Sequence, residues 1–147
     1  MSAVIRAGSQ AEADAIGHIF VRARDTMAYL PRIGDDVRQN LGGWITSRHE
    51  IWVLEDSGRV VGFAGLSRAW LDHLYVDPDC QGRGIGSMLL EHVKGLQSEG
   101  TQLWVFQKNV GARRFYERHD FRLERMTDGS GNMEHEPDAL YTWQRKS

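Results

Sequence analysis

The sequence is poor in the residues and patterns that mark several specialised classes of protein. It has one cysteine in 147 residues, Cys80, so no disulfide can form within the chain and no cysteine-based metal site is expected. The longest apolar stretch, near VVGFAGL, is much too short to cross a membrane. The segment MSAVIRAG has neither the basic nor the apolar region of a secretory signal. We therefore expect a cytoplasmic protein without a bound metal.

An excess of charge is also missing, and the charges present are unevenly distributed. The formal net charge is −2, yet residues 81–125 carry eight Lys and Arg against five acids. This surplus of positive charge is too small for binding a nucleic-acid duplex, which needs a dense basic face. It suits a ligand with a few phosphate groups, although an ordinary solvated helix surface has similar charges. The length fits one domain, 1–147.

Apolar spacing and turn residues predict a mixed α/β sheet with helices on both faces. Strands are expected at 4–8, 51–55, 59–66, 70–77, 101–106, 121–126 and 139–143. Helices are expected after the capping box SQAE, from Asp35 or Asp36, over 85–96, and after Asn109. The strand–helix–strand unit 71–106 requires a parallel crossover.

The segment DPDCQGRGIGSMLLEHV places three glycines at alternate positions directly before the most periodic helix. Glycine allows positive φ angles and close approach of a ligand to the backbone. Such a loop aims free N–H groups and the positive end of a helix dipole at one point, which favours phosphate. The spacing fails the dinucleotide-binding fingerprint and the segment lacks the Lys-Ser/Thr of a P-loop. A tight turn without a ligand remains the alternative.

Two motifs together resemble those of the GCN5-related N-acetyltransferases. The run Gln81-Gly82-Arg83-Gly84-Ile85-Gly86 is similar to that family's Q/R-x-x-G-x-G/A motif, and NVGARRFYERHDF (109–121) is similar to its second motif. The order of expected elements also matches that family. The resemblance implies a mostly antiparallel sheet in which two neighbouring parallel strands splay apart. Asp120 departs from the family pattern, in which many members have glycine.

The resemblance also implies an activity and a set of binding residues. The activity is direct transfer of an acetyl group from acetyl-CoA, the co-substrate, to a primary amine within a ternary complex. The pyrophosphate would lie against Gln81, Gly82, Arg83, Gly84, Ile85, Gly86 and Ser87. The pantetheine arm would pair with Leu74, Tyr75 and Val76 and contact Asn109. A non-catalytic acyl-CoA sensor or partner-binding domain of the same fold is the alternative. No nucleic acid or membrane partner is expected.

Two residues are candidates for proton transfer. Tyr116 matches the family's tyrosine that protonates the departing thiolate, although a Phe-Tyr pair on a helix is also typical of core packing. His73 shares a strand face with Tyr75 and would point towards the first two helices, away from Asp72, Leu74 and Val76. A histidine that titrates near neutrality suits removal of the amine proton. Packing of His73, the weaker candidate Glu55 and a chain of waters remain alternatives.

The acceptor amine is expected between the first two helices and the loop before the last strand. Plausible contributors are Tyr29, Trp44, Trp70, Glu134 and Glu136. Acidic side chains there would attract a cationic amine, but a charged loop is more often simply solvated. The sequence leaves the acceptor open, whether small molecule or peptide. A homodimer is expected because the resemblance implies it, since many members of that family dimerise, and because Trp143, in the last strand, offers apolar surface.

Overall fold

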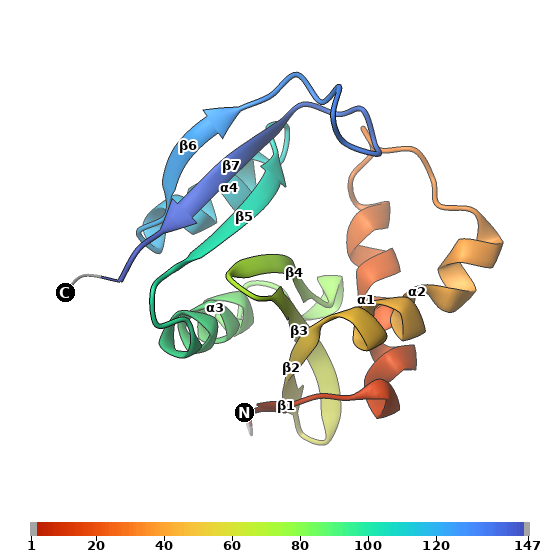
Figure 1. Cartoon of the computed structure of the whole chain (residues 1–147). Coiled ribbons are helices and arrows are strands. Elements are labelled where there is room, and N and C mark those ends of the chain that lie inside the picture. The colour runs from red at the N-terminus through yellow and green to blue at the C-terminus, as the bar shows by residue number, and fades with distance from the viewer. Residues whose placement is uncertain (1–2, 146–147) are drawn as a thin grey trace.

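One seven-stranded sheet organises the protein, as the computed structural model of residues 3–145 shows (Figure 1). Its strands are β1 (Ala3–Ala7), β2 (Glu50–Asp56), β3 (Arg59–Ser67), β4 (Trp70–Val76), β5 (Thr101–Phe106), β6 (Arg122–Met126) and β7 (Asp138–Trp143). The helices are α1 (Ala13–Asp25), α2 (Asp35–Arg48), α3 (Ile85–Leu96) and α4 (Val110–Arg118), with short 3-10 turns η1 (Gln10–Glu12) and η2 (Pro78–Cys80). This order confirms the order expected from the sequence.

The strand order is β1-β2-β3-β4-β5-β7-β6, and every neighbouring pair is antiparallel except β4 and β5. The β2–β3 hairpin turns through Ser57 and Gly58, which have φ angles of 54° and 83°. The parallel β4–β5 pair follows from the crossover through α3, because a helix must return the chain to the starting edge. The mostly antiparallel sheet with one parallel pair confirms the expected fold class.

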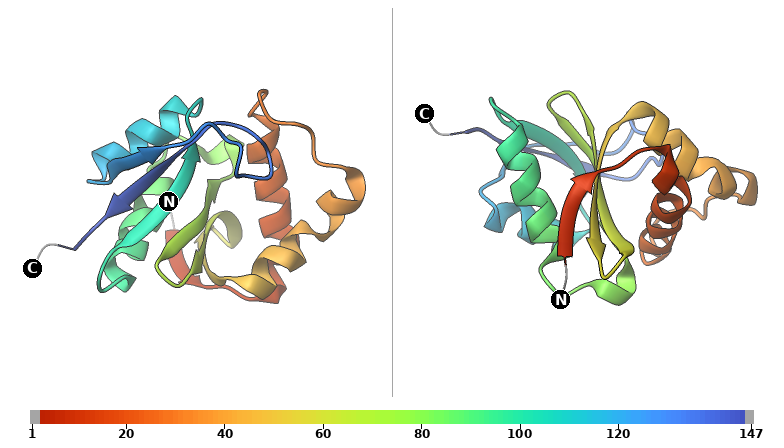
Figure 2. Two further views of the ribbon diagram at one scale, coloured as in Figure 1. Left: turned by 45° about the horizontal axis from the view of Figure 1, so that its top comes forward. Right: turned by 90° about the horizontal axis from the view of Figure 1, so that it is seen from below.

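Helices cover both faces of the sheet (Figure 2). On one face, Ile16, Ile19 and Phe20 of α1 pack with Ile45 of α2 against β2 and β3. On the other face, α3 buries its apolar side, including Leu89, Leu90 and Val93. The two helices α1 and α2 lie so close that a Cβ on Gly42 would overlap the Ala13 carbonyl oxygen. This contact explains a glycine in the middle of α2, where the sequence alone weakened the prediction of a helix.

A bulge in β4 changes which side chains share a face of the sheet. Gly65 pairs with His73 and Leu66 with Leu71, so Asp72 has no partner residue on β3. An extra residue of this kind interrupts strict alternation. Asp72 therefore contacts His49, the C-cap of α2, on the same side as His73. The expectation that Asp72 lies on the opposite face with Leu74 was wrong for this reason.

The last strand leaves its tryptophan only partly exposed. The Trp143 ring packs against Phe121, and the cationic ends of Lys94 and Arg145 lie 4.9 and 5.6 Å from the Trp143 ring centroid. The apolar surface expected at Trp143 is therefore partly covered by its own chain, and the homodimer stays a prediction. Within residues 3–145, no helix is long and apolar enough to span a membrane.

Candidate active site

The parallel strands β4 and β5 separate almost as soon as they pair. Within residues 3–145, their ladder contains one residue pair, Trp70 with Gln102. The Gln102 amide and the Thr101 hydroxyl both donate to the Ala69 carbonyl, at 2.9 and 2.8 Å, and hold this end together. Beyond it the strands diverge, so one backbone edge of Leu74–Val76 is open to a ligand that can form hydrogen bonds like a strand.

A groove of about 770 Å³ occupies the space beside this open edge. Nearly all the residues that the sequence assigned to the coenzyme line it. They are Leu74, Tyr75, Val76, Gln81, Gly82, Gly84, Ile85, Gly86, Ser87 and Asn109. Arg83 differs, because it is exposed and does not line the groove. Lys108 and Arg118 do line it and add positive charge that the family motif did not single out.

The glycine loop owes its shape to left-handed backbone conformations. Gly82 and Gly84 have φ angles of 81° and 78°, and a Cβ on either would meet no atom within 4 Å. These two glycines are therefore required by backbone geometry, with open space around them. Gly84 is also the N-cap of α3, whose first intrahelical bond runs from the Met88 amide to the Gly84 carbonyl at 3.0 Å. The amides of the first turn are thus free to bind an anion.

Helix α4 brings Tyr116 to the other side of the groove. Asn109 caps this helix, since its Oδ1 accepts from the Ala112 amide at 3.2 Å. The Tyr116 ring is buried edge-on between Phe115 and Phe121 and also lines the groove. Burial, with a smaller contribution from Tyr75, raises the pKa of the Tyr116 phenol. The phenol therefore keeps its proton at neutral pH and can donate it.

A hydrogen-bonded chain of three side chains supports Ser87 at the start of α3. The Ser87 Oγ lies 3.0 Å from Nε2 of His119, and Nδ1 of His119 lies 2.7 Å from Oε2 of Glu91. Lys94 binds both Glu91 and the His119 carbonyl. This chain fixes the direction of the Ser87 hydroxyl, and Ser87 lines the groove. Sequence reasoning missed it because His119 and Ser87 are far apart in the sequence.

His73 is placed differently from its expected role. Its ring packs among Phe20, His49 and Phe63 and does not line the groove. Burial, and to a lesser degree the neighbouring His49, lowers the pKa of His73 to about 4. The expectation that His73 titrates near neutrality was therefore wrong, and its role as a base stays a prediction. Glu55 accepts hydrogen bonds from Arg6 and also lies outside the groove.

The predicted acceptor residues do not gather in one place. Tyr29 lines the groove, with its ring 6.0 Å from that of Phe106. Trp70 stacks parallel to Trp104 across the β4–β5 gap at 6.5 Å between ring centroids. Trp44 is 48% exposed on α2 and does not line the groove. The structure therefore brings only part of the predicted acceptor set to the gap between the strands.

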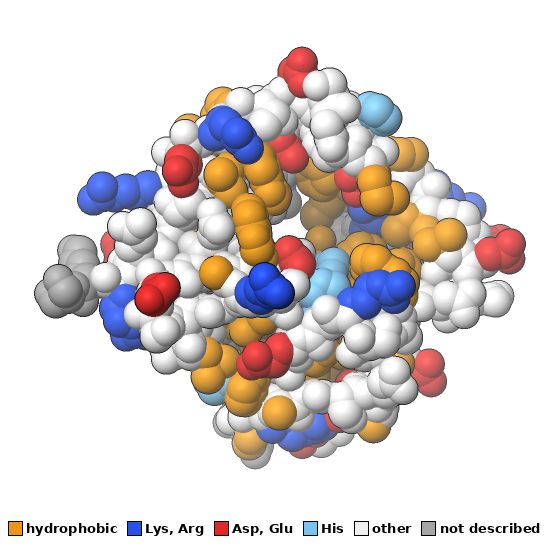
Figure 3. Space-filling model, viewed as in Figure 1, with side chains coloured by type: hydrophobic (Ala, Val, Ile, Leu, Met, Phe, Trp, Pro, Cys, Tyr) orange, Lys and Arg blue, Asp and Glu red, His pale blue; other side chains and the backbone are white. Residues whose placement is uncertain are grey.

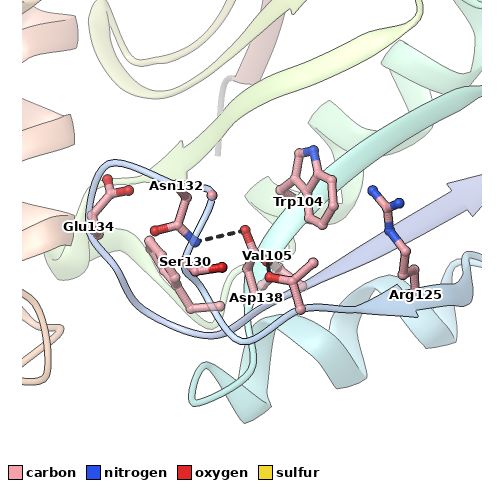
Figure 4. Close-up of a pocket in the computed structure, with 10 residues that line it drawn as sticks. Trp104, Val105, Arg125, Ser130, Asn132, Glu134 and Asp138 are labelled. Carbon is pink, nitrogen blue, oxygen red and sulfur yellow. Dashed lines mark hydrogen bonds between the residues drawn. The ribbon is translucent and has the colours of Figure 1, made fainter.

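A hollow lies between the C-terminal strands and the α1–α2 side of the molecule, rimmed by hydrophobic side chains (Figure 3). One part of it, a pocket of about 630 Å³, has Trp104 and Arg125 on one side and Ser130, Asn132 and Glu134 on the other (Figure 4). The loop that carries Glu134, residues 127–137, is anchored to Asp138. Asp138 accepts from Asn132 Nδ2 at 3.1 Å and from the Thr127 hydroxyl.

The acids of this loop are already paired with cations. Glu134 accepts from Arg24 of α1 at 3.3 Å, and Glu136 lies 3.6 Å from the Lys108 ammonium. The expectation that these acids offer free negative charge to a cationic amine therefore does not fit this geometry. Within residues 3–145, no group of three His, Cys, Asp or Glu side chains is arranged to hold a metal ion.

Comparison with known proteins identifies the family. The family described as the acetyltransferase (GNAT) domain matches residues 47–123, just over half of the chain. This chain belongs to that family, which confirms the resemblance of its two motifs. The matched segment includes the strand β4, the glycine loop and the Tyr116 helix.

Individual relatives agree with this assignment. The peptidyl-lysine N-acetyltransferase YjaB of Salmonella typhimurium is 38% identical over 74 residues, which cover 50% of each chain. The solution structure of apo YjaB from Escherichia coli superposes with a TM-score of 0.77 at 26% identity, covering 97% of both chains. The structure of yncA from Salmonella typhimurium with its cofactor acetyl-CoA has a TM-score of 0.78 at 20% identity, covering 98% of this chain and 94% of yncA. The chain spans about half the length of the first curated relatives that it matches.

Proposed function

We propose that this chain is a cytoplasmic, acetyl-CoA-dependent N-acetyltransferase that acts on a primary amine by direct transfer in a ternary complex. One observation carries the proposal: the open edge of β4 and the glycine loop of α3 line the same groove. An extended thioester with a phosphate-bearing end needs both features, a strand-like edge for its amides and backbone donors for its phosphates.

The two ends of the groove suit the two ends of such a donor. Free amides at the start of α3 would bind the pyrophosphate, and Arg118, which lines the same groove, would add positive charge. The edge of Leu74–Val76 would pair with the pantetheine amides. The similarly folded yncA has acetyl-CoA as its cofactor, which supports this choice of donor.

The chemistry requires proton movements at two atoms. The amine nitrogen attacks the thioester carbonyl and loses a proton, the C–N bond forms, and the C–S bond breaks as the sulfur gains a proton. Backbone N–H groups of β4 would stabilise the oxyanion. Tyr116, kept neutral by burial, would donate the proton to sulfur. His73 or a chain of waters would accept the amine proton, and the low pKa of His73 favours the water chain.

Thiol release from acetyl-CoA, followed with a panel of amines and paired with mass analysis of the amine products, tests the proposal. Amine-dependent thiol release with an acetylated product is the expected result. Tight binding of acetyl-CoA without any turnover across the panel would favour the alternative, a sensor of acyl-CoA. Thiol release without an acetylated amine would point to a thioesterase.

A further inference from the structure

The three hydrogen-bonded side chains that end at Ser87 connect the groove to a histidine. Ser87 lies in the first turn of α3 and lines the groove, and its Oγ is 3.0 Å from Nε2 of His119 at the end of α4. The other ring nitrogen, Nδ1, is 2.7 Å from Oε2 of Glu91, one turn further along α3. The His119 side chain is only 17% exposed and is held at both nitrogens. A change in its charge would therefore reach the groove through a single hydroxyl group.

Glu91 fixes the proton on Nδ1 of His119. Burial alone would raise the pKa of the Glu91 carboxyl, but hydrogen bonds from His119 and Lys94 hold that pKa below its ordinary value. Glu91 is therefore ionised at neutral pH, and an ionised carboxylate only accepts hydrogen bonds. Since Nδ1 must donate to Glu91, Nε2 is the nitrogen that gains or loses a proton as the pH changes.

The charged groups around the His119 ring come from two helices. From α3, Glu91 pairs with the ring, and the Lys94 ammonium lies 3.3 Å from Oε2 of Glu91 and donates to the His119 carbonyl at 3.0 Å. The charged neighbours of His119 along the chain are all exposed: Glu117, Arg118 and Asp120. Within residues 3–145, Glu91 is the only ion-pair partner of the His119 ring, and it provides the negative charge that a protonated ring needs.

The Ser87 hydroxyl has one hydrogen, and the charge of His119 decides where it points. With a neutral ring, Nε2 accepts from the hydroxyl, so the groove meets only oxygen lone pairs. With a charged ring, Nε2–H donates to Oγ, and the hydroxyl hydrogen is free for another acceptor. A phosphate oxygen in the groove can receive this hydrogen only if the ring takes up a proton or the bond to Nε2 breaks. Breaking that bond would leave Nε2 of a mostly buried ring without a partner, which is costly.

We propose that His119 is a positioning residue for the coenzyme: binding of the acetyl-CoA pyrophosphate is coupled to uptake of a proton from solvent by Nε2 of His119, which turns the Ser87 hydroxyl towards the phosphate. Glu91 acts through His119, because it keeps Nδ1 protonated and stabilises the positive ring. The proton returns to solvent when the coenzyme leaves. The inference rests on the coenzyme placement in the proposed function and adds to it an affinity that depends on pH.

The sign of the pH dependence follows from the proton balance. The complex holds more protons than the free protein, so affinity for acetyl-CoA should fall as pH rises through the range of about 5 to 8 in which histidines ordinarily titrate. The contact at stake is a hydrogen bond to a charged group, so we expect a fall on the order of 10-fold. Calorimetric titration in two buffers with different ionisation enthalpies should also detect proton uptake on binding.

His119→Gln separates this coupling from a purely structural role. The glutamine amide can donate to Ser87 at every pH and takes up no proton, so affinity in this variant should change less with pH. A role limited to packing would instead weaken binding equally at every pH. The coenzyme's own phosphates titrate alike in both proteins, so they do not affect the comparison. The matched control is His18→Gln, an exposed histidine on α1, which should keep the wild-type pH dependence.

Two further variants change the ends of the hydrogen-bonded series. Glu91→Gln removes the negative charge beside the ring, so the fall in affinity should move to lower pH. Ser87→Ala removes the hydroxyl and should reduce the pH dependence although His119 is still present. These variants keep the inference testable if His119→Gln does not fold, which thermal unfolding would reveal.

All these measurements follow binding, so they do not need turnover. Proton-coupled binding of acetyl-CoA by a protein that acetylates no amine would support the inference while refuting the proposed activity. Wild-type pH dependence and proton uptake in His119→Gln, or an unshifted profile in Glu91→Gln, would overturn the inference and leave the proposed function standing. No binding of acetyl-CoA by the wild type at any pH would overturn both.

Discussion

Replacing Gly86 with aspartate should separate binding of the coenzyme from stability of the fold. Gly86 lies in the first turn of α3 and lines the groove. A Cβ at this position would lie 3.5 Å from Phe115 Cζ, an ordinary van der Waals contact. Glycine within a helix is destabilising by roughly 0.5–1 kcal/mol relative to alanine, and an acid near a helix N-terminus stabilises by roughly 0.3–1 kcal/mol. The variant should therefore fold about as well as the wild type.

Binding of acetyl-CoA should suffer strongly in the same variant. A carboxylate and a phosphate oxygen about 5 Å apart repel by about 3 kcal/mol at an effective dielectric constant of about 20. Such a penalty corresponds to an affinity loss on the order of 100-fold. Gly84 is a poorer position for this test, since its φ of 78° would add backbone strain to any substitution.

Calorimetric titration with acetyl-CoA and thermal unfolding measure the two effects separately. Gly86→Ala is the matched control, because it adds a Cβ without charge and should keep most of the affinity. A folded Gly86→Asp variant that binds acetyl-CoA as tightly as the wild type would refute the placement of the pyrophosphate at the start of α3.

Three further predictions concern catalysis, pH and assembly. Tyr116→Phe keeps the ring packed and should lower kcat by about 10²- to 10⁴-fold with little change in acetyl-CoA affinity; an unchanged kcat across the pH range would make Tyr116 a core residue only. His73 has a pKa lowered from 6.5 to about 4, so the unfolded state binds more protons between these values and stability should fall as pH drops through that window, by at most about 3 kcal/mol. Chemical denaturation of His73→Gln should show a weaker dependence on pH there, and an identical slope would count against a buried neutral His73. Light scattering should detect the homodimer that we still expect, and a monomer at working concentrations would dismiss it.

Most of the fold could be predicted from the sequence because its local signals agree with one another. The capping box of Ser9 and Glu12 forms as expected, although it opens a 3-10 turn ahead of α1. The cap of α4 at Asn109 also forms as expected. Asp120, the departure from the family pattern, adopts the left-handed conformation with φ of 70°, as its short polar side chain allows. In each case a local hydrogen bond or backbone preference decides the structure.

The candidate site was less predictable because it depends on contacts between distant segments. The bulge at Asp72 is invisible in the alternation of β4 and alters which side chains face α2. The burial of His73 depends on Phe20 and Phe63, from two other elements. The position of Arg24 near the groove could not be predicted from the sequence, because arginine is common in the last turn of a helix. Only the folded chain brings it to Tyr29 and the loop before β7.

The central claim is that this groove transfers an acetyl group from acetyl-CoA to an amine. Mass analysis of a reaction that contains the protein, acetyl-CoA and a panel of primary amines tests it most directly, with thiol release followed in the same sample. The account predicts one acetylated amine for each thiol released, and loss of both in Gly86→Asp. Thiol release without acetylated amine, or no reaction with any primary amine by a protein that binds acetyl-CoA, would contradict it.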